Sequence, residues 1–281
     1  MVDIAIIGAG PAGLSAAVNA YARNKSVLVI GRGKETSALW KAERVANHLG
    51  MHEFSGAALM EEYLEHALAL GIEVQEGRVL QILDVGKHFM LNIGAEVVEA
   101  KAVILATGVQ KGSRLPGEES LLGKGVSYCA TCDGMFFRGK EVVVVGELAE
   151  AEEDVNFLAG LCARVRYLPL YSGVGHVDEK AEIISGKPEA VLGDERVTGI
   201  RVNGEEIACD GVFLMKAAAP LDSLISGLQT ESNIVVVDKG MRTNVPGVYA
   251  CGDCTGWPLQ LSKAIGEGLI AAQMAVRELN V

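Results

Sequence analysis

A glycine-rich turn between an apolar strand and a small-residue helix opens the chain. Residues 2–7 read Val-Asp-Ile-Ala-Ile-Ile, and Gly8-x-Gly10-x-x-Gly13 follows directly. An alanine-rich stretch and a second apolar run complete the pattern, which predicts a β-α-β unit with two parallel strands. Its glycines suit a sharp bend, the close approach of a pyrophosphate, and helix packing. We therefore expect dinucleotide binding rather than a bare structural turn.

One position departs from this fingerprint. The second strand ends at Gly31, where an acid usually contacts the ribose hydroxyl. Glu35 is an unconvincing substitute, so the ribose contact stays open.

The strand and turn pattern returns further along the chain. Residues 103–108 form another apolar run ending in glycine, and the polar stretch 111–119 is typical of a domain linker. Residues 141–146 restart the cycle as a second nucleotide-binding fold. After residues 248–253, a closing helix is expected from Gln260 to about Leu279. The sequence predicts an α/β protein with two Rossmann-like domains.

Charge and hydropathy exclude two classes of partner. The formal net charge of −11 argues against nucleic acid, because no basic surplus offsets phosphate repulsion. No apolar run approaches the roughly 20 residues of a membrane span, and no basic leader precedes the first strand. We expect a cytoplasmic protein without membrane contact.

Two pairs of the six cysteines stand at C-x-x-C spacing. Cys129-Ala130-Thr131-Cys132-Asp133 has three interpretations: a redox dithiol, half of a zinc site, or two buried cysteines. The other pair, Cys251 and Cys254, lies much further along the chain than the roughly 15 to 20 residues usual between zinc-ligand pairs. A dithiol suits the spacing better, with Asp133 placed to relay protons, and we expect no metal.

The residues around this dithiol resemble a known family. Gly125-Val126-Ser127-Tyr128-Cys129-Ala130-Thr131-Cys132-Asp133-Gly134 is similar to the active site of low-molecular-weight thioredoxin reductases. The resemblance spans nearly the whole chain and implies a homodimer with a three-layer ββα architecture in both domains. It implies a FAD domain of residues 1–113 and 243–281, with a dithiol domain of residues 117–240 inserted between them. One domain would rotate on the other, exposing the dithiol alternately to flavin and to thioredoxin.

The resemblance also implies roles for single residues. Cys132 would face the flavin, Cys129 would attack the partner disulfide, and Asp133 would be the acid/base. The expected FAD-binding residues are Gly8, Gly10, Pro11, Ala12, Gly13, Asn47, Ala106, Thr107, Gly108, Gly252, Asp253, Gln260 and Leu261. Cys251 and Cys254 flank the Gly252-Asp253 pair, and we interpret them as small residues packed near the cofactor rather than a second redox centre.

The second glycine turn breaks the family pattern. It reads Gly146-Glu147-Leu148-Ala149-Glu150-Ala151, so only the first glycine remains. Carboxylates crowd the following helix start, where they favour the helix dipole and repel a phosphate. No basic cluster for a 2′-phosphate follows the next strand, and the sequence predicts a degenerate pyridine-nucleotide site. The pattern is similar to the flavin thioredoxin reductases that take electrons from ferredoxin.

Several alternatives stay open. NAD(P)H could bind in an altered pose, a deazaflavin could be the donor, or a second flavin could fill the vacated pocket. A redox-sensing scaffold flavoprotein is another, against which the intact dithiol and Asp133 count. Residues 21–45 carry a surplus of positive charge, which favours docking of an acidic ferredoxin on the FAD domain. The same segment could also be a solvated loop without a partner.

Overall fold

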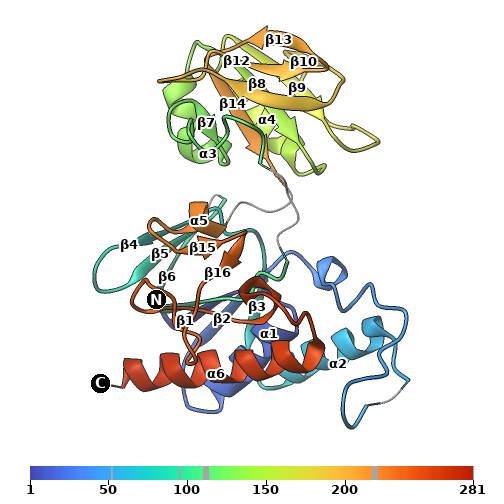
Figure 1. The fold of residues 1–281 in the computed structure, drawn as a ribbon, viewed down its shortest axis with the longest axis vertical. Coiled ribbons are helices and arrows are strands. Elements are labelled where there is room, and N and C mark those ends of the chain that lie inside the picture. Colours follow the sequence, from blue (N-terminus) through green and yellow to red (C-terminus); the bar gives the residue numbers. More distant parts are fainter. Residues whose placement is uncertain (52, 95, 110–113, 217–220, 281) are drawn as a thin grey trace. The chain divides into compact units, whose positions relative to one another are not determined.

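The computed structural model describes all residues except 52, 95, 110–113, 217–220 and 281. The chain forms two compact units, one of residues 1–110 and 220–281 and the other of residues 111–219. The second unit is inserted in the first, and each has a parallel sheet with helices packed on it, as predicted (Figure 1).

The first unit is built on the strand order β3-β2-β1-β6-β5-β4, with β17 also paired to β6. The parallel pairs are β1 with β2, β1 with β6, β2 with β3, and β6 with β17. Strand β5 pairs antiparallel with β4 on one side and with β6 on the other. The strands are β1 (Val2–Ile7), β2 (Val27–Gly31), β3 (Glu73–Glu76), β4 (Gln81–Asp84), β5 (Phe89–Ile93), β6 (Glu96–Leu105) and β17 (Val248–Ala250). Their helices are α1 (Pro11–Tyr21), η1 (Lys34–Thr36), α2 (Gly56–Ala69), η3 (Gly252–Thr255) and α6 (Leu261–Leu279).

Small residues let α1 and α6 pack closely on one face of this sheet. Side chains of α1, α2 and α6 share one buried core with Ile4 and Ile6 of β1. A Cβ at Gly268 of α6 would stand 2.2 Å from the Ala12 carbonyl oxygen, so the contact admits only glycine. The C-terminal helix therefore covers the first β-α-β unit (Figure 1).

The chain returns to the first unit earlier than expected. Residues from 220 on belong to it, whereas the sequence placed the boundary at 243. Ile225, just after α5 (Leu221–Leu224), bridges Ile82 of β4. The hairpin of β15 (Thr230–Glu231) and β16 (Ile234–Val235) brings Ile234 against Gly256. These short elements carry a weak pattern in sequence, and their contacts assign them to the first unit.

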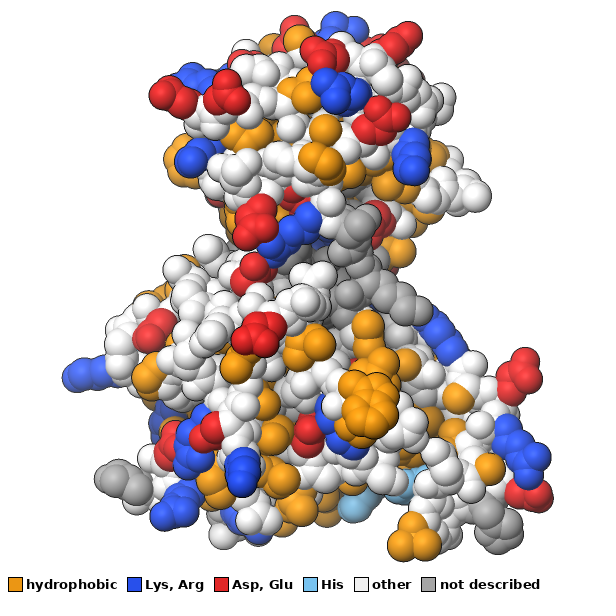
Figure 2. Space-filling model, in the orientation of Figure 1, with side chains coloured by type: hydrophobic (Ala, Val, Ile, Leu, Met, Phe, Trp, Pro, Cys, Tyr) orange, Lys and Arg blue, Asp and Glu red, His pale blue; other side chains and the backbone are white. Residues whose placement is uncertain are grey.

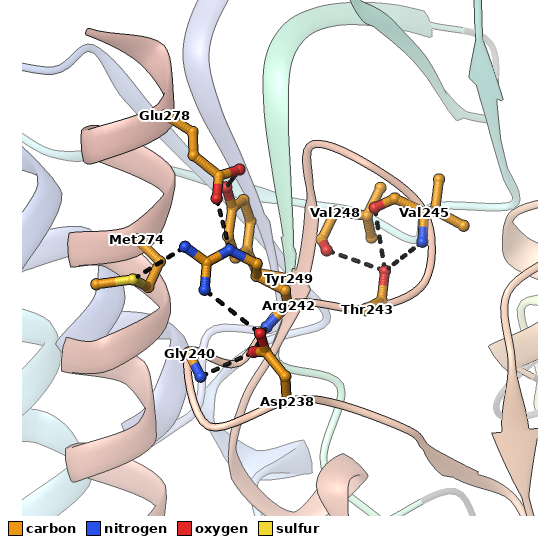
Figure 3. Close-up of polar contacts among 9 residues, drawn as sticks. All are labelled: Asp238, Gly240, Arg242, Thr243, Val245, Val248, Tyr249, Met274 and Glu278. Atoms are coloured by element: carbon orange, nitrogen blue, oxygen red, sulfur yellow. Dashed lines mark hydrogen bonds and ion pairs between the residues drawn. The ribbon is translucent and has the colours of Figure 1, made fainter. Parts of the chain in front are cut away.

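Residues 238–249 are tied to α6 by polar contacts (Figure 3). The Arg242 side chain donates to Glu278 and to Asp238, and its backbone N–H donates to Asp238 at 2.9 Å. The Tyr249 hydroxyl donates to the other Glu278 carboxylate oxygen. This cluster fixes the strand that leads into Gly252.

The second unit has the strand order β10-β9-β8-β14-β7, all parallel. Its elements are β7 (Val126–Ser127), α3 (Ala130–Asp133), η2 (Gly134–Phe137), β8 (Glu141–Gly146), α4 (Ala151–Ala159), β9 (Arg164–Pro169), β10 (Ala181–Ile183), β11 (Pro188–Leu192), β12 (Gly199–Val202), β13 (Glu205–Ala208) and β14 (Gly211–Met215). Alternate β8 residues enter different cores: Val143 and Val145 pack with β11–β13, and Val142 and Val144 pack with α4. This is the expected three-layer ββα arrangement.

A buried ion pair joins the beginning and the end of the second unit. Lys216 Nζ lies 2.6 Å and 2.9 Å from the two carboxylate oxygens of Glu118. The side chain of Glu118 is 0% exposed and that of Lys216 is 7% exposed. The Tyr128 hydroxyl and the Leu115 backbone N–H also donate to Glu118, so its charge is satisfied without water.

In the described part of the chain, no helix combines the length and apolar character needed to cross a membrane.

Glu118→Gln is expected to destabilise the second unit by about 3–5 kcal/mol, because it removes the negative charge that faces the buried ammonium group of Lys216. Urea unfolding followed by far-UV circular dichroism measures the change. Glu119→Gln is the matched control, since Glu119 is exposed and its loss is expected to cost about 0.5 kcal/mol or less. Equal midpoints for the two variants would contradict this account of the ion pair.

Candidate functional site

The three glycines of the first turn do different work. A Cβ at Gly8, whose φ is +119°, would stand 2.1 Å from the Ala106 carbonyl oxygen. A Cβ at Gly13 would stand 1.8 Å from the Gly8 carbonyl oxygen. Both glycines are therefore required for the fold itself. A Cβ at Gly10 would meet only Ser37 Oγ, at 3.9 Å, so the space beside Gly10 is open.

The open space lies at the start of α1. Pro11 occupies the first helical position, and the N–H groups of Ala12 and Gly13 lie in the first turn, where an α-helix offers donors without intrahelical partners. Such a helix start attracts an anionic group. The arrangement fits the pyrophosphate of a dinucleotide.

The parallel strands bring the other predicted cofactor residues to the same edge. Leu105 of β6 is in register with Ile7 of β1 and with Ala250 of β17. Ala106, Thr107 and Gly108 follow β6, and Cys251, Gly252 and Asp253 follow β17. A Cβ at Gly252 would lie 2.7 Å from the Cβ of Ala12, so this segment passes directly over α1.

Two residues that the sequence analysis missed hold this edge. Glu267 accepts from the Gly252 backbone N–H at 2.9 Å, and Lys263 Nζ donates to the carbonyl oxygens of Gly252 and Gly256 at 2.8 Å. Lys263 and Glu267 also form an i,i+4 ion pair. Burial raises the pKa of Asp253, with Lys263 opposing it. The i,i+4 spacing just after Gly252-Asp253 was a signal in the sequence.

Asn47 and Gln260, predicted as cofactor residues from distant parts of the chain, meet in the structure. Asn47 Nδ2 donates to Gln260 Oε1 at 2.9 Å. Gln260 is the N-cap of α6, and Leu261 begins that helix. The neighbouring His48 Nδ1 lies 3.3 Å from Ser262 Oγ. The segment before α2 therefore borders the start of α6.

Cys251 and Cys254 are buried free thiols. Cys254 Sγ donates to the carbonyl oxygens of Leu105 and Cys251. Burial raises the pKa of Cys251 well above its ordinary value and that of Cys254 to about 11. Both thiols stay protonated at neutral pH, which agrees with packing residues rather than a second redox pair.

Cys129 and Cys132 form a disulfide in the second unit. Cys129 is the N-cap of α3, and its Sγ accepts from the Cys132 backbone N–H at 3.1 Å. Thr131 Oγ1 lies 3.5 Å from the same sulfur. These contacts would stabilise a thiolate on Cys129 once the disulfide opens. The pairing agrees with the dithiol interpretation rather than the zinc one.

Asp133 follows Cys132 and is held by a residue that the sequence analysis did not single out. Ser127 Oγ donates to Asp133 Oδ2 at 2.7 Å and accepts from the Cys129 backbone N–H at 3.0 Å. Ser127 stands two residues before Cys129 in the quoted motif, so proximity was its only signal in sequence.

The first glycine of the second turn is closely packed, as Gly8 is in the first turn. A Cβ at Gly146 would stand 2.7 Å from Tyr167 Oη and 2.8 Å from Ala151 Cβ. At the start of α4 the backbone N–H groups of Ala151, Glu152 and Glu153 donate to carbonyl oxygens three residues earlier. The donors that would face a phosphate are therefore used within the turn.

Comparison with known proteins places this architecture. Residues 2–165 and 176–268 match the family described as pyridine nucleotide-disulphide oxidoreductase. The chain belongs to this family. It is 35% identical to a thioredoxin reductase of Listeria innocua, over 97% of this chain and 92% of the relative. A thioredoxin reductase of Bacillus subtilis is also 35% identical, over 96% and 92%.

Solved structures of reductases are similar over almost the whole chain. A ferredoxin-flavin thioredoxin reductase from Clostridium acetobutylicum has a TM-score of 0.92 and 41% identity, covering 99% of this chain and 98% of that one. An atypical thioredoxin reductase from Desulfovibrio vulgaris Hildenborough has a TM-score of 0.77 and 30% identity, covering 100% and 98%. This protein is thus a flavin-dependent disulfide oxidoreductase of the thioredoxin reductase type, called the reductase below.

The cofactor of the reductase is FAD, on which this family depends. The residues present fit it, since the space beside Gly10 would admit a pyrophosphate at the start of α1. Bound there, FAD would accept electrons and pass them to a disulfide. The individual FAD contacts named from the sequence stay predictions.

Gly10→Val is expected to abolish FAD binding while leaving the fold intact, because its side chain would enter open space that the pyrophosphate needs. Flavin absorbance of the purified protein and circular dichroism measure the two effects. Gly266→Ala on α6, also in open space, is the control and is expected to keep FAD. A yellow Gly10→Val protein with full flavin content would contradict the pyrophosphate position.

Proposed function

We propose that the reductase transfers electrons from reduced ferredoxin through FAD and the Cys129–Cys132 disulfide to thioredoxin, without NADPH. The carboxylate of Glu152 is the observation that carries the donor assignment. Glu152 lies in the first turn of α4 and is 7% exposed. It accepts from the backbone N–H groups of Gly175 and His176, at 2.9 Å and 2.6 Å, and from the Tyr171 hydroxyl.

Glu152 thus joins the start of α4 to the loop after β9, the region in which we would expect contacts to a nucleotide 2′-phosphate. Its three donors lower the pKa of Glu152, the Tyr171 hydroxyl contributing most, so it carries a negative charge at neutral pH. Asn156 of α4 forms two further hydrogen bonds with the loop after β9: it donates to the His176 carbonyl oxygen at 2.6 Å and accepts from the Asp178 N–H. The loop after β9 is closed against α4 by side chains of the protein itself. A phosphate arriving there would meet a fixed carboxylate and occupied donors.

The similar proteins agree with this reading. The Listeria and Bacillus relatives are named thioredoxin reductases, and the Clostridium structure is named a ferredoxin-flavin thioredoxin reductase. We infer thioredoxin as the substrate and ferredoxin as the donor on this support together with the contacts of Glu152.

The roles proposed for the dithiol follow from the family resemblance and agree with its contacts. Cys129 would attack the disulfide of thioredoxin, as the family resemblance implies, and the Cys132 N–H and the Thr131 hydroxyl lie within hydrogen-bond distance of its sulfur. Cys132 would exchange electrons with the flavin, and Asp133 would give and take the proton. Met135 and Phe136, immediately after Asp133, are 56% and 73% exposed. An apolar surface beside a redox centre favours a protein substrate.

In the structure, acidic residues from outside the basic segment of residues 21–45 pair with two of its basic side chains. Lys34 pairs with Glu61, and Arg44 pairs with Glu53. Figure 2 shows basic and acidic side chains mixed over the face in view. Because of Arg32 and Lys41, we retain this segment as the proposed ferredoxin surface. The homodimer and the cytoplasmic location stay predictions from sequence.

An anaerobic donor comparison tests the donor assignment. Reduced ferredoxin is expected to bleach the flavin absorbance, whereas NADPH and NADH are expected to leave it unchanged even at high concentration. Bleaching by NADPH at catalytic rates would overturn the argument from Glu152. Bleaching by a reduced deazaflavin but not by reduced ferredoxin would make a deazaflavin the donor in place of ferredoxin. Reduction of the flavin without any reduction of thioredoxin would favour the redox-sensing alternative.

Cys132→Ser is expected to keep FAD but to block electron flow to thioredoxin, because the reduced flavin then meets no disulfide. Thioredoxin thiols formed per unit time measure the loss. Cys162→Ser, which changes a free cysteine outside the disulfide, is the control and is expected to keep turnover. Full turnover by Cys132→Ser would remove the dithiol assignment.

Charge reversal at Arg32, Lys34 and Lys41 is expected to slow ferredoxin-driven flavin reduction about tenfold at low salt and to flatten its salt dependence. Stopped-flow rates across a salt series measure both. Reversal of the exposed Lys180, Lys187 and Arg196 in the second unit gives the same change in net charge and is the control. Equal effects of the two triple variants would place the donor elsewhere.

A further inference from the structure

We propose that Ser127 is a positioning residue that hydrogen-bonds Asp133 in both of its protonation states through a hydroxyl hydrogen that changes its acceptor. The inference rests on the proposed function, because it takes Asp133 as the acid/base of the dithiol. It adds a residue to which neither the sequence motif nor the comparisons assign a role.

The geometry around Ser127 is closed on all sides. Ser127 ends β7, is 2% exposed, and is held by the pairing of β7 with Phe213 of β14. Its hydroxyl lies 2.7 Å from Asp133 Oδ2 and 3.2 Å from the Cys129 carbonyl oxygen. It also accepts the Cys129 backbone N–H at 3.0 Å. One hydroxyl therefore contacts both ends of the Cys129-to-Asp133 turn.

A serine hydroxyl has one hydrogen to donate and two lone pairs to accept with. Its hydrogen therefore serves one of the two acceptors at a time. When Asp133 is ionised, the hydrogen is directed at Asp133, because a charge-assisted bond is the stronger one. When Asp133 is protonated, the carboxyl O–H donates to Ser127 Oγ and the serine hydrogen turns to the Cys129 carbonyl oxygen.

Both protonation states of Asp133 are thus fully hydrogen-bonded without movement of a heavy atom. The bond to the ionised state is charge-assisted and roughly twice as strong as the neutral one. Removing the hydroxyl would also leave the Cys129 N–H without this acceptor.

The change of acceptor by the Ser127 hydroxyl hydrogen accompanies reduction of the dithiol. Breaking the Cys129–Cys132 bond places two electrons, delivered from reduced flavin, on the two sulfurs. Asp133 would take up the proton that reduced flavin loses with the two electrons and give it to one sulfur, while the other would remain the thiolate that later attacks the substrate disulfide. Asp133 is then a carboxylate and receives the Ser127 hydrogen again.

Charged groups on the neighbouring elements have partners of their own. The face of α4 that packs on Gly134 is apolar, formed by Phe157 and Leu158, and β14 contributes only Gly211–Met215. The ionisable groups on the surrounding elements, besides the two cysteines, are Glu118 with Tyr128 and Lys216, Arg138 near Met135, Lys140 over the Phe137 ring, and Glu152, Glu153 and Asp154 at the start of α4. Among the described residues, Ser127 is the one whose hydroxyl lies 2.7 Å from the Asp133 carboxylate.

The test is the pH profile of Ser127→Ala. We expect the limb of thioredoxin turnover that reports Asp133 to move by about one pH unit to higher pH, the difference between a charge-assisted and a neutral bond. The pH dependence of iodoacetamide alkylation of the reduced dithiol is expected to move in the same direction. Ser127→Thr keeps a hydroxyl and is expected to restore the wild-type midpoint. Ser120→Ala, which removes an exposed hydroxyl of the same unit, is expected to change neither profile.

Asp133→Asn separates this inference from the proposed function. Unchanged turnover and pH profile in Asp133→Asn would overturn the acid/base role of Asp133 itself. Loss of turnover in Asp133→Asn together with a wild-type profile in Ser127→Ala would overturn the role of Ser127 alone. The double variant is expected to match Asp133→Asn. If Ser127→Ala does not fold, Ser127→Cys replaces it with a smaller shift in the same direction, and a wild-type profile there contradicts the inference.

Discussion

The contact between the Gly8 carbonyl oxygen and Gly13 governs the first unit. It leaves no room for a side chain, and Gly8 in turn packs on the Ala106 carbonyl oxygen. These two approaches bring β1, β6 and the start of α1 together, and β17 adds Gly252 to the same edge. Every predicted cofactor residue near that edge depends on this packing. Gly10 alone among the three glycines leaves space, which is why the fold and the cofactor site can be separated by mutation.

The second unit uses the same topology for a different result. Its turn packs at Gly146 against Tyr167 and Ala151, and the Glu152 carboxylate accepts from two backbone N–H groups of the loop after β9. In a fold that commonly binds a nucleotide, the Glu152 side chain here joins α4 to the loop after β9. The second unit also carries the dithiol, since Cys129, Cys132 and Asp133 lie on a short turn after β7.

The sequence was most informative where backbone geometry demands particular residues. The glycine turn and the cysteine pair were readable, because a bend and a sulfur pair leave direct traces, whereas the degenerate second nucleotide site and the role of Asp133 stay predictions. The meeting of Asn47 with Gln260 was expected only through the family resemblance, since no local pattern links such distant residues. The return of the chain near residue 220 was misplaced at 243, because short elements such as β15 and β16 carry little periodicity. Glu118 acts through its contact with the distant Lys216, which one sequence does not display. Ser127 and Lys263 left only weak local signals, the proximity to Cys129 and the i,i+4 spacing to Glu267.

The central claim is that electrons reach thioredoxin through FAD and the Cys129–Cys132 disulfide without a pyridine nucleotide. The most direct measurement is complete anaerobic turnover, in which thiols formed on thioredoxin are counted with one reductant at a time. The account predicts thiol formation with catalytic enzyme and reduced ferredoxin, and none above background with NADPH. Sustained thiol formation with NADPH, at a rate equal to or above that with reduced ferredoxin, would contradict it.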